Sequence, residues 1–108
     1  MKILVLPGDG IGPEITAATL AVLDRANTKF KLGLEWDIRD IGFAALKKHG
    51  STFPESIQQA AREAPGIILG PVSHLDYPPK EQGGINPSGW LRVQLDLFAN
   101  IRPAKSRM

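Results

Sequence analysis

Two arginines near the end of the chain, Arg92 and Arg102, are the residues best suited to binding a charged substrate. Each guanidinium presents parallel N–H donors that can bind a carboxylate through two hydrogen bonds. If the fold brings them together, the pair suits an organic acid with several carboxylates. The alternative is structural: Arg92 pairs with Asp96 one helical turn further on, and Arg102 lies in solvent. By themselves the residues favour this structural alternative.

The glycine-rich turn PGDGIGPE, residues 7–14, is a second candidate site. Glycines allow a ligand to approach the backbone closely, and a helix N-terminus offers free N–H groups to phosphate. The spacing of Gly8, Gly10 and Gly12 is, however, one residue shorter than the GxGxxG pattern of dinucleotide-binding proteins. Pro13 also removes an amide donor where a pyrophosphate would need one. We therefore expect no conventional Rossmann site, and a turn that serves only the fold stays open as an alternative.

The only histidines are His49 and His74. His49 follows two lysines at a predicted helix end, which is typical of a surface position. His74 lies near Asp76 in a long loop, but two ligands do not define a metal site. We therefore expect no metal site within this chain.

Composition narrows the class of protein. The chain has 108 residues, enough for a small domain, with a formal charge of +2 and no cysteine. The lack of cysteine excludes disulfides and thiolate metal sites and is compatible with a cytoplasmic location. Basic residues are scattered, so we expect no nucleic-acid partner. No apolar stretch approaches the length of a membrane span, so we expect no membrane partner either.

The elements that must position these residues alternate between strands and helices. We expect strands over 2–6, 32–38, 66–70 and 97–101, and helices over 13–28 and 43–50 and beginning near Pro54 and Ser88. This order predicts an α/β layered fold with a largely parallel sheet, and ligands bind such sheets at the carboxyl ends of the strands. The chain ends after a predicted strand without a closing helix, so we expect a truncated domain.

The first helix shows apolar residues at helical spacing. They are Ile15, Ala18, Val22, Leu23 and Ala26. We expect them to form its packed stripe. In the last helix, Ser88 is expected to be the N-cap and Leu91 and Leu95 to point inward.

Three segments together resemble a known family. They are ILVLPGDGIGPEI at the start, IILGPV in the middle and LRVQLDLFANIRPAK at the end. The chain is similar over its whole length to the N-terminal part of the isocitrate/isopropylmalate dehydrogenases, which decarboxylate 2-hydroxy acids. The resemblance implies an isopropylmalate dehydrogenase-like fold that is not Rossmann, and it assigns residues 1–108 to part of the first domain.

The resemblance also implies a cofactor site. The glycine turn would lie near the nicotinamide end of NAD or NADP, with Ile11 beside the ring. The segment from Gly70 to Ile85 would border the cofactor, which implies contacts from Val72, Ser73 and Ile85.

The same resemblance implies that Arg92 and Arg102 hold the carboxylates of the substrate. The segment that distinguishes substrates reads GGINPSGW, where Asn86 and Ser88 are polar and uncharged and no pair of leucines offers an apolar cleft. An isocitrate-like or tartrate-like acid therefore fits better than isopropylmalate. The segment aligns cleanly with neither type, so the substrate stays open.

The implied reaction is oxidation of a 2-hydroxy diacid or triacid, followed by decarboxylation, with Mg²⁺ or Mn²⁺. A homodimer is also implied. The proton-transferring residues and the metal ligands would lie beyond Met108, so we expect residues 1–108 alone to be inactive. Two alternatives remain: a non-catalytic regulatory or anion-binding subunit of the same family, and a stand-alone phosphate-binding module.

Overall fold

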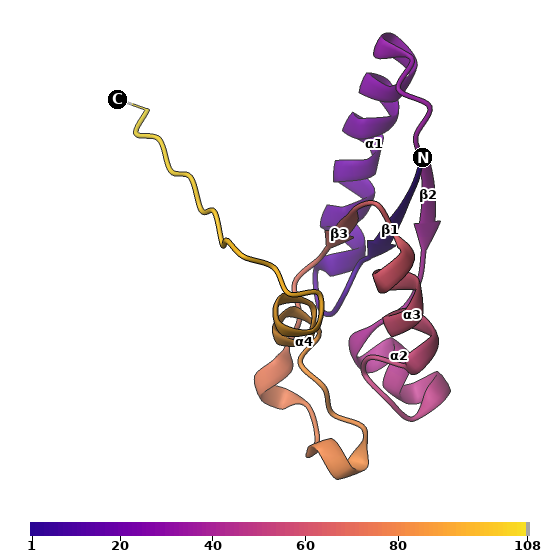
Figure 1. Ribbon diagram of the computed structural model, residues 1–108, viewed down its shortest axis with the longest axis vertical. Helices are drawn as coiled ribbons and strands as arrows, with labels where there is room; N and C mark the ends of the chain where they lie inside the picture. The colour runs from indigo at the N-terminus through magenta and orange to yellow at the C-terminus, as the bar shows by residue number, and fades with distance from the viewer. Residues whose placement is uncertain (108) are drawn as a thin grey trace.

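A three-stranded parallel sheet forms the centre of the computed structural model, which describes residues 1–107 (Figure 1). Its strands are β1 (Lys2–Leu6), β2 (Glu35–Ile38) and β3 (Ile67–Leu69). The order is β2-β1-β3, so β1 is central. Lys2 pairs with Glu35 on one side and Leu4 with Ile67 on the other, both in parallel register. The predicted α/β fold with a parallel sheet is confirmed.

Helices follow each strand, as the sequence predicts. They are α1 (Gly12–Phe30), α2 (Gly42–His49), α3 (Glu55–Glu63) and α4 (Pro87–Gln94), with two short 3-10 turns, η1 (His74–Asp76) and η2 (Lys80–Gln82). Pro13 lies in the first turn of α1, where its missing N–H costs nothing. Gly50 ends α2 in the left-handed conformation that glycine adopts without strain.

The core lies between the sheet and the two helices α3 and α4. Its buried residues are Leu4, Leu6, Ile41, Phe53, Ile57, Ala61 and Leu91. Leu4 and Leu6 point to the same face of β1 because side chains alternate along a strand, and Val5 points to the opposite face. All three are at most 1% exposed. The segment between β3 and α4 also packs on this core, through Val72 and Ile85.

The packed face of α1 differs from the predicted stripe. Its buried residues are Gly12, Thr16 and Leu20. Ile15 and Val22 are 43% and 70% exposed. The buried residues thus include a threonine, whereas three members of the predicted apolar stripe, Ile15, Ala18 and Val22, are exposed.

Strand β2 is shorter than predicted because the residues before it are held by a side chain. Asn27 of α1 donates to the carbonyl of Leu34 at 2.9 Å and accepts from its N–H at 3.0 Å. Gly33 has a positive φ of 70°, which breaks the extended run. The strand therefore begins at Glu35 instead of residue 32.

The predicted strand over 97–101 is wrong. Residues 97–107 form no regular element and run away from the rest of the fold (Figure 1). A turn at Leu95 and Asp96 separates this segment from α4, and the φ of Asp96 is 53°. A strand depends on hydrogen bonds from a neighbouring strand. The described residues offer this segment no such partner, and Phe98 and Ile101 are 101% and 82% exposed.

Within residues 1–107, none of the helices combines the length and the apolar character needed to cross a membrane.

Candidate functional site

The glycine turn lies directly against the segment after β3. A Cβ added to Gly8 would lie 2.1 Å from the carbonyl oxygen of Pro71. A Cβ added to Gly70 would lie 1.9 Å from the carbonyl oxygen of Pro7. Atoms cannot approach so closely, so the two segments fit together only because both positions lack a side chain. These glycines therefore allow close contact between two distant parts of the chain.

The N-terminus of α1 is poorly suited to phosphate. The N–H of Gly12 already donates to the carbonyl of Asp9 at 2.8 Å. Pro13 has no N–H to offer. Ile11 is 64% exposed and presents an apolar surface in the middle of the turn. The turn therefore offers an apolar surface where a Rossmann loop would offer amide donors.

Asp9 ties three segments together, and no local pattern in the sequence indicates this role. It is 7% exposed, which is unusual for an aspartate. One carboxylate oxygen accepts from the N–H of Phe43 at 2.8 Å. The other accepts from the N–H of Ser73 at 3.0 Å and from the hydroxyl of Tyr77. The N–H of Asp9 also donates to the carbonyl of Pro71 at 2.8 Å.

Tyr77 completes this cluster through both its ring and its hydroxyl. Its ring packs edge-on against Phe43, with ring centres 5.1 Å apart. Burial, and secondarily the hydrogen bond and negative charge of Asp9, raise the pKa of Tyr77 above its ordinary value. The hydroxyl therefore stays protonated and donates to Asp9.

The N-cap of α4 is not the residue that the sequence predicts. Asn86, not Ser88, is the N-cap of α4, and its side-chain oxygen accepts from the N–H groups of Ser88 and Gly89 at 3.1 and 3.3 Å. Pro87 follows at the first helical position, which favours this assignment. Leu91 is buried as predicted, and Leu95 packs at the edge of the core.

The structure brings Ser88 and Arg92 together on one face of α4. The Arg92 guanidinium donates to the hydroxyl of Ser88 at 3.4 Å, and its Nε donates to the Ser88 carbonyl at 3.4 Å. Arg92 is exposed. No ion pair joins Arg92 to Asp96 in the described part of the chain, so the alternative structural pairing is not observed. The guanidinium thus faces solvent and is held only by long hydrogen bonds.

Arg102 lies in the extended segment 97–107 and is exposed. This segment runs away from the sheet (Figure 1). Joint binding of a substrate by the two arginines stays a prediction.

Thr52 is a second residue that the sequence analysis missed. Its hydroxyl donates to the carbonyl of Ile85 and accepts from its N–H, both at 2.7 Å. Thr52 is fully buried, and it thereby fixes the residue just before the cap of α4. A threonine followed by phenylalanine and proline gives no local sign of such a long-range contact.

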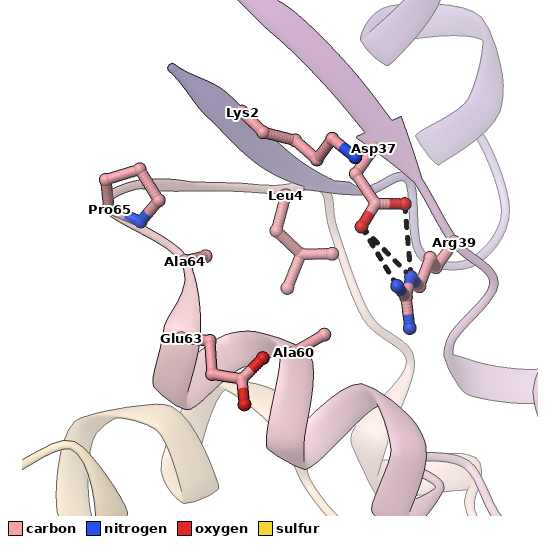
Figure 2. A pocket seen from close by; sticks show the side chains of 8 residues that line it. All are labelled: Lys2, Leu4, Asp37, Arg39, Ala60, Glu63, Ala64 and Pro65. Atoms are coloured by element: carbon pink, nitrogen blue, oxygen red, sulfur yellow. Dashed lines mark hydrogen bonds and ion pairs between the residues drawn. The ribbon is translucent and has the colours of Figure 1, made fainter.

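Two of the hollows on the surface bear on ligand binding. One of about 270 Å³ lies beside β1 and α3 (Figure 2), and Lys2, Asp37, Arg39 and Glu63 are among its lining residues. Arg39 pairs with Asp37 at 3.1 Å within it, which neutralises both charges. The other, of about 500 Å³, is lined in part by Ile85, Asn86 and Trp90. Of these two, only the second includes residues that the sequence predicts to bind a ligand.

Residues 1–107 contain no group of three or more His, Cys, Asp or Glu side chains placed to hold a metal ion. His49 and His74 are both exposed. The residues described here therefore do not fit a divalent metal by themselves.

The parallel sheet, the glycine turn against the segment after β3, and the exposed arginine on α4 define an α/β protein with a non-Rossmann candidate site at the strand ends. A family model, isocitrate/isopropylmalate dehydrogenase, matches residues 2–107. The chain belongs to this family.

Individual relatives and a solved structure agree with this family assignment. The chain is 44% identical over 109 residues to 3-isopropylmalate dehydrogenase of Methylococcus capsulatus, with 96% of the chain and 29% of that protein covered. It is 41% identical over 105 residues to 3-isopropylmalate dehydrogenase of Acinetobacter baylyi, with 95% and 29% covered. The crystal structure of isocitrate dehydrogenase from Methylococcus capsulatus superimposes with a TM-score of 0.71 at 29% identity, covering 88% of this chain and 26% of that one. The chain thus spans about 29% of the length of these curated relatives.

Proposed function

We propose that this chain is the N-terminal part of a dehydrogenase that oxidises and decarboxylates a 2-hydroxy diacid or triacid with NAD or NADP and a divalent metal. Membership of the family supports the type of reaction. The observation that supports a carboxylic acid substrate is the exposed guanidinium of Arg92 beside the hydroxyl of Ser88. We further propose a homodimer in the cytoplasm.

Arg92 would bind one carboxylate of the acid. The guanidinium makes only long hydrogen bonds, both to Ser88 of α4. It can therefore turn its paired donors toward an anion without breaking a strong contact. Ser88 adds a hydroxyl at the same place, and both side chains are polar. An isocitrate-like or tartrate-like acid therefore fits this face better than one with an apolar branch.

Ile11, Val72, Ser73 and Ile85 would form the cofactor side. Ile11 gives an apolar surface, and Asp9 holds the segment with Val72 and Ser73 next to the same turn. These residues would hold the nicotinamide end of NAD or NADP, which would supply the hydride acceptor for the oxidation. The residues of this chain would orient the acid and the nicotinamide ring relative to each other. Such orientation supplies much of the rate enhancement of an enzyme.

The test uses the protein as its gene encodes it, assayed with NAD or NADP, Mn²⁺ and a panel of 2-hydroxy diacids and triacids. We expect Arg92→Gln to lower kcat/KM about 10- to 100-fold, as the loss of a charged hydrogen bond predicts. Arg25→Gln, on the exposed part of α1, should leave it unchanged. Equal activity of Arg92→Gln and the parent would refute the role of Arg92.

Two other outcomes separate the alternatives. Binding of the acids without turnover would indicate a regulatory or anion-binding subunit. Residues 1–108 alone should show no turnover. Stabilisation of that piece by nucleotide would favour a phosphate-binding module instead.

A further inference from the structure

We propose that Asp9 is a positioning residue that shapes the cofactor side of the proposed active site by holding the segment with Val72 and Ser73. This inference rests on the proposed function. Its physical basis is the buried carboxylate, which joins the glycine turn, the start of α2 and the segment after β3.

The surroundings of Asp9 are built around a carboxylate. Gly42 has a positive φ of 69°, and a Cβ added there would lie 2.2 Å from a carboxylate oxygen of Asp9. The N-cap of α2, Ile41, makes no side-chain hydrogen bond to its own helix. Asp9 instead accepts from the N–H of Phe43 in the first turn of α2. A carboxylate at this position is favoured by the helix dipole, and here it is supplied from a distant part of the sequence.

Asp9 also fixes the orientation of the peptide between Val72 and Ser73. Its side chain accepts from the N–H of Ser73, and its own N–H donates to the carbonyl of Pro71. Residues 70–73 form no helix or strand of their own. Backbone in such a segment is placed by its long-range contacts, so Asp9 decides where Val72 and Ser73 lie relative to Ile11.

Tyr77, four residues after Ser73, is a further contact of Asp9 with the chain that follows β3. Its hydroxyl donates to the carboxylate oxygen that also accepts from Ser73, and its ring packs on Phe43. The side chain of Asp9 thus holds the chain both at Ser73 and at Tyr77. Three donors from the protein compensate for burial of the carboxylate, since a buried charge without partners is costly.

Asp9→Asn tests this proposal because it keeps the shape but presents an amide N–H₂ to one of the existing donors. In the protein as its gene encodes it, we expect the KM for NAD or NADP to rise about tenfold, with the KM for the hydroxy acid within about twofold of the parent. Tyr77→Phe, which removes one donor, should shift the same KM in the same direction by less. Tyr77→Phe also tests the proposal if Asp9→Asn fails to fold.

A control for lost stability is Leu20→Ala, which removes a buried side chain of α1 that takes no part in the hydrogen bonds of Asp9. A purely structural effect lowers the amount of folded enzyme without changing the KM for the cofactor, as we expect for Leu20→Ala. Hydrogen exchange of the Ser73 amide gives a readout that needs no activity. That exchange should speed up about tenfold or more in Asp9→Asn and stay unchanged in Leu20→Ala.

The outcomes separate the two proposals. An unchanged Ser73 exchange rate in Asp9→Asn would overturn the positioning role. Faster exchange with an unchanged cofactor KM would overturn its link to the cofactor. A parent protein that turns over none of the acids contradicts the proposed function, while the exchange result still reports whether Asp9 holds the segment.

Discussion

The carboxylate of Asp9 accepts a hydrogen bond of 3.0 Å from the N–H of Ser73, which lies 64 residues further along the chain. This contact joins the turn after the first strand to the segment after the third. Parallel strands make such contacts possible, because their carboxyl ends meet at one edge of the sheet. The pair thus links the two parts of the sequence that we propose to lie beside the cofactor.

Tyr77 should resist ionisation in the folded protein. It is the only tyrosine, so tyrosinate absorbance reports on it alone. Burial and Asp9 raise its pKa, so the native hydroxyl should still be protonated at about pH 10, the ordinary value at which the urea-unfolded chain ionises. The stabilisation is therefore fully present below about pH 10 and is lost as the pH rises through the higher folded value. Identical titrations of the folded and unfolded chains would contradict the contact with Asp9.

Gly70→Ala should destabilise the fold by about 3 kcal/mol, because the new Cβ would collide with a backbone carbonyl that cannot move independently. The matched control is Gly66→Ala. Its Cβ would lie 3.3 Å from the end of the Ile3 side chain, which can give way. Urea unfolding of the two variants measures the difference. Equal free energies of unfolding would show that the two segments do not pack as described.

Asn86→Ala should lower the free energy of unfolding by about 1 kcal/mol, because two N–H groups of α4 lose their cap. Asn86→Asp should keep most of the stability, since its oxygen can accept the same bonds. Ser88→Ala, which removes no cap, should cost less than Asn86→Ala. The reverse order of Asn86→Ala and Ser88→Ala in denaturant unfolding would restore Ser88 as the cap.

Thr52→Val should cost about 1–3 kcal/mol, because the isosteric valine leaves the partly buried N–H and carbonyl of Ile85 without their partner. Thr28→Val, at an exposed position of α1, should change the free energy of unfolding by less than about 0.5 kcal/mol. Thermal unfolding of both proteins checks this prediction. A loss no greater than that of Thr28→Val would show that Thr52 does not anchor Ile85.

Local patterns predicted most of the elements. The apolar runs of β1 and β3 and the Pro13 start of α1 depend on neighbours in sequence, so they could be read directly. The strand over 97–101 could not, because a strand needs a partner that sequence pattern does not reveal. The packed face of α1 was misjudged for a similar reason: Thr16 and Leu20 are buried while Val22 is exposed.

The sequence by itself determined the alternation of strands and helices, the mismatch of the glycine turn with a pyrophosphate site, and the resemblance to a family. The tertiary structure decided that Asp9 is buried and holds Ser73 and Tyr77, and that Asn86 caps α4. It also decided that Arg92 meets Ser88 and that Arg102 lies in an exposed segment without regular structure. Periodicity and turn chemistry act between neighbouring residues. Burial and hydrogen bonds between distant segments arise only when the strands are placed side by side.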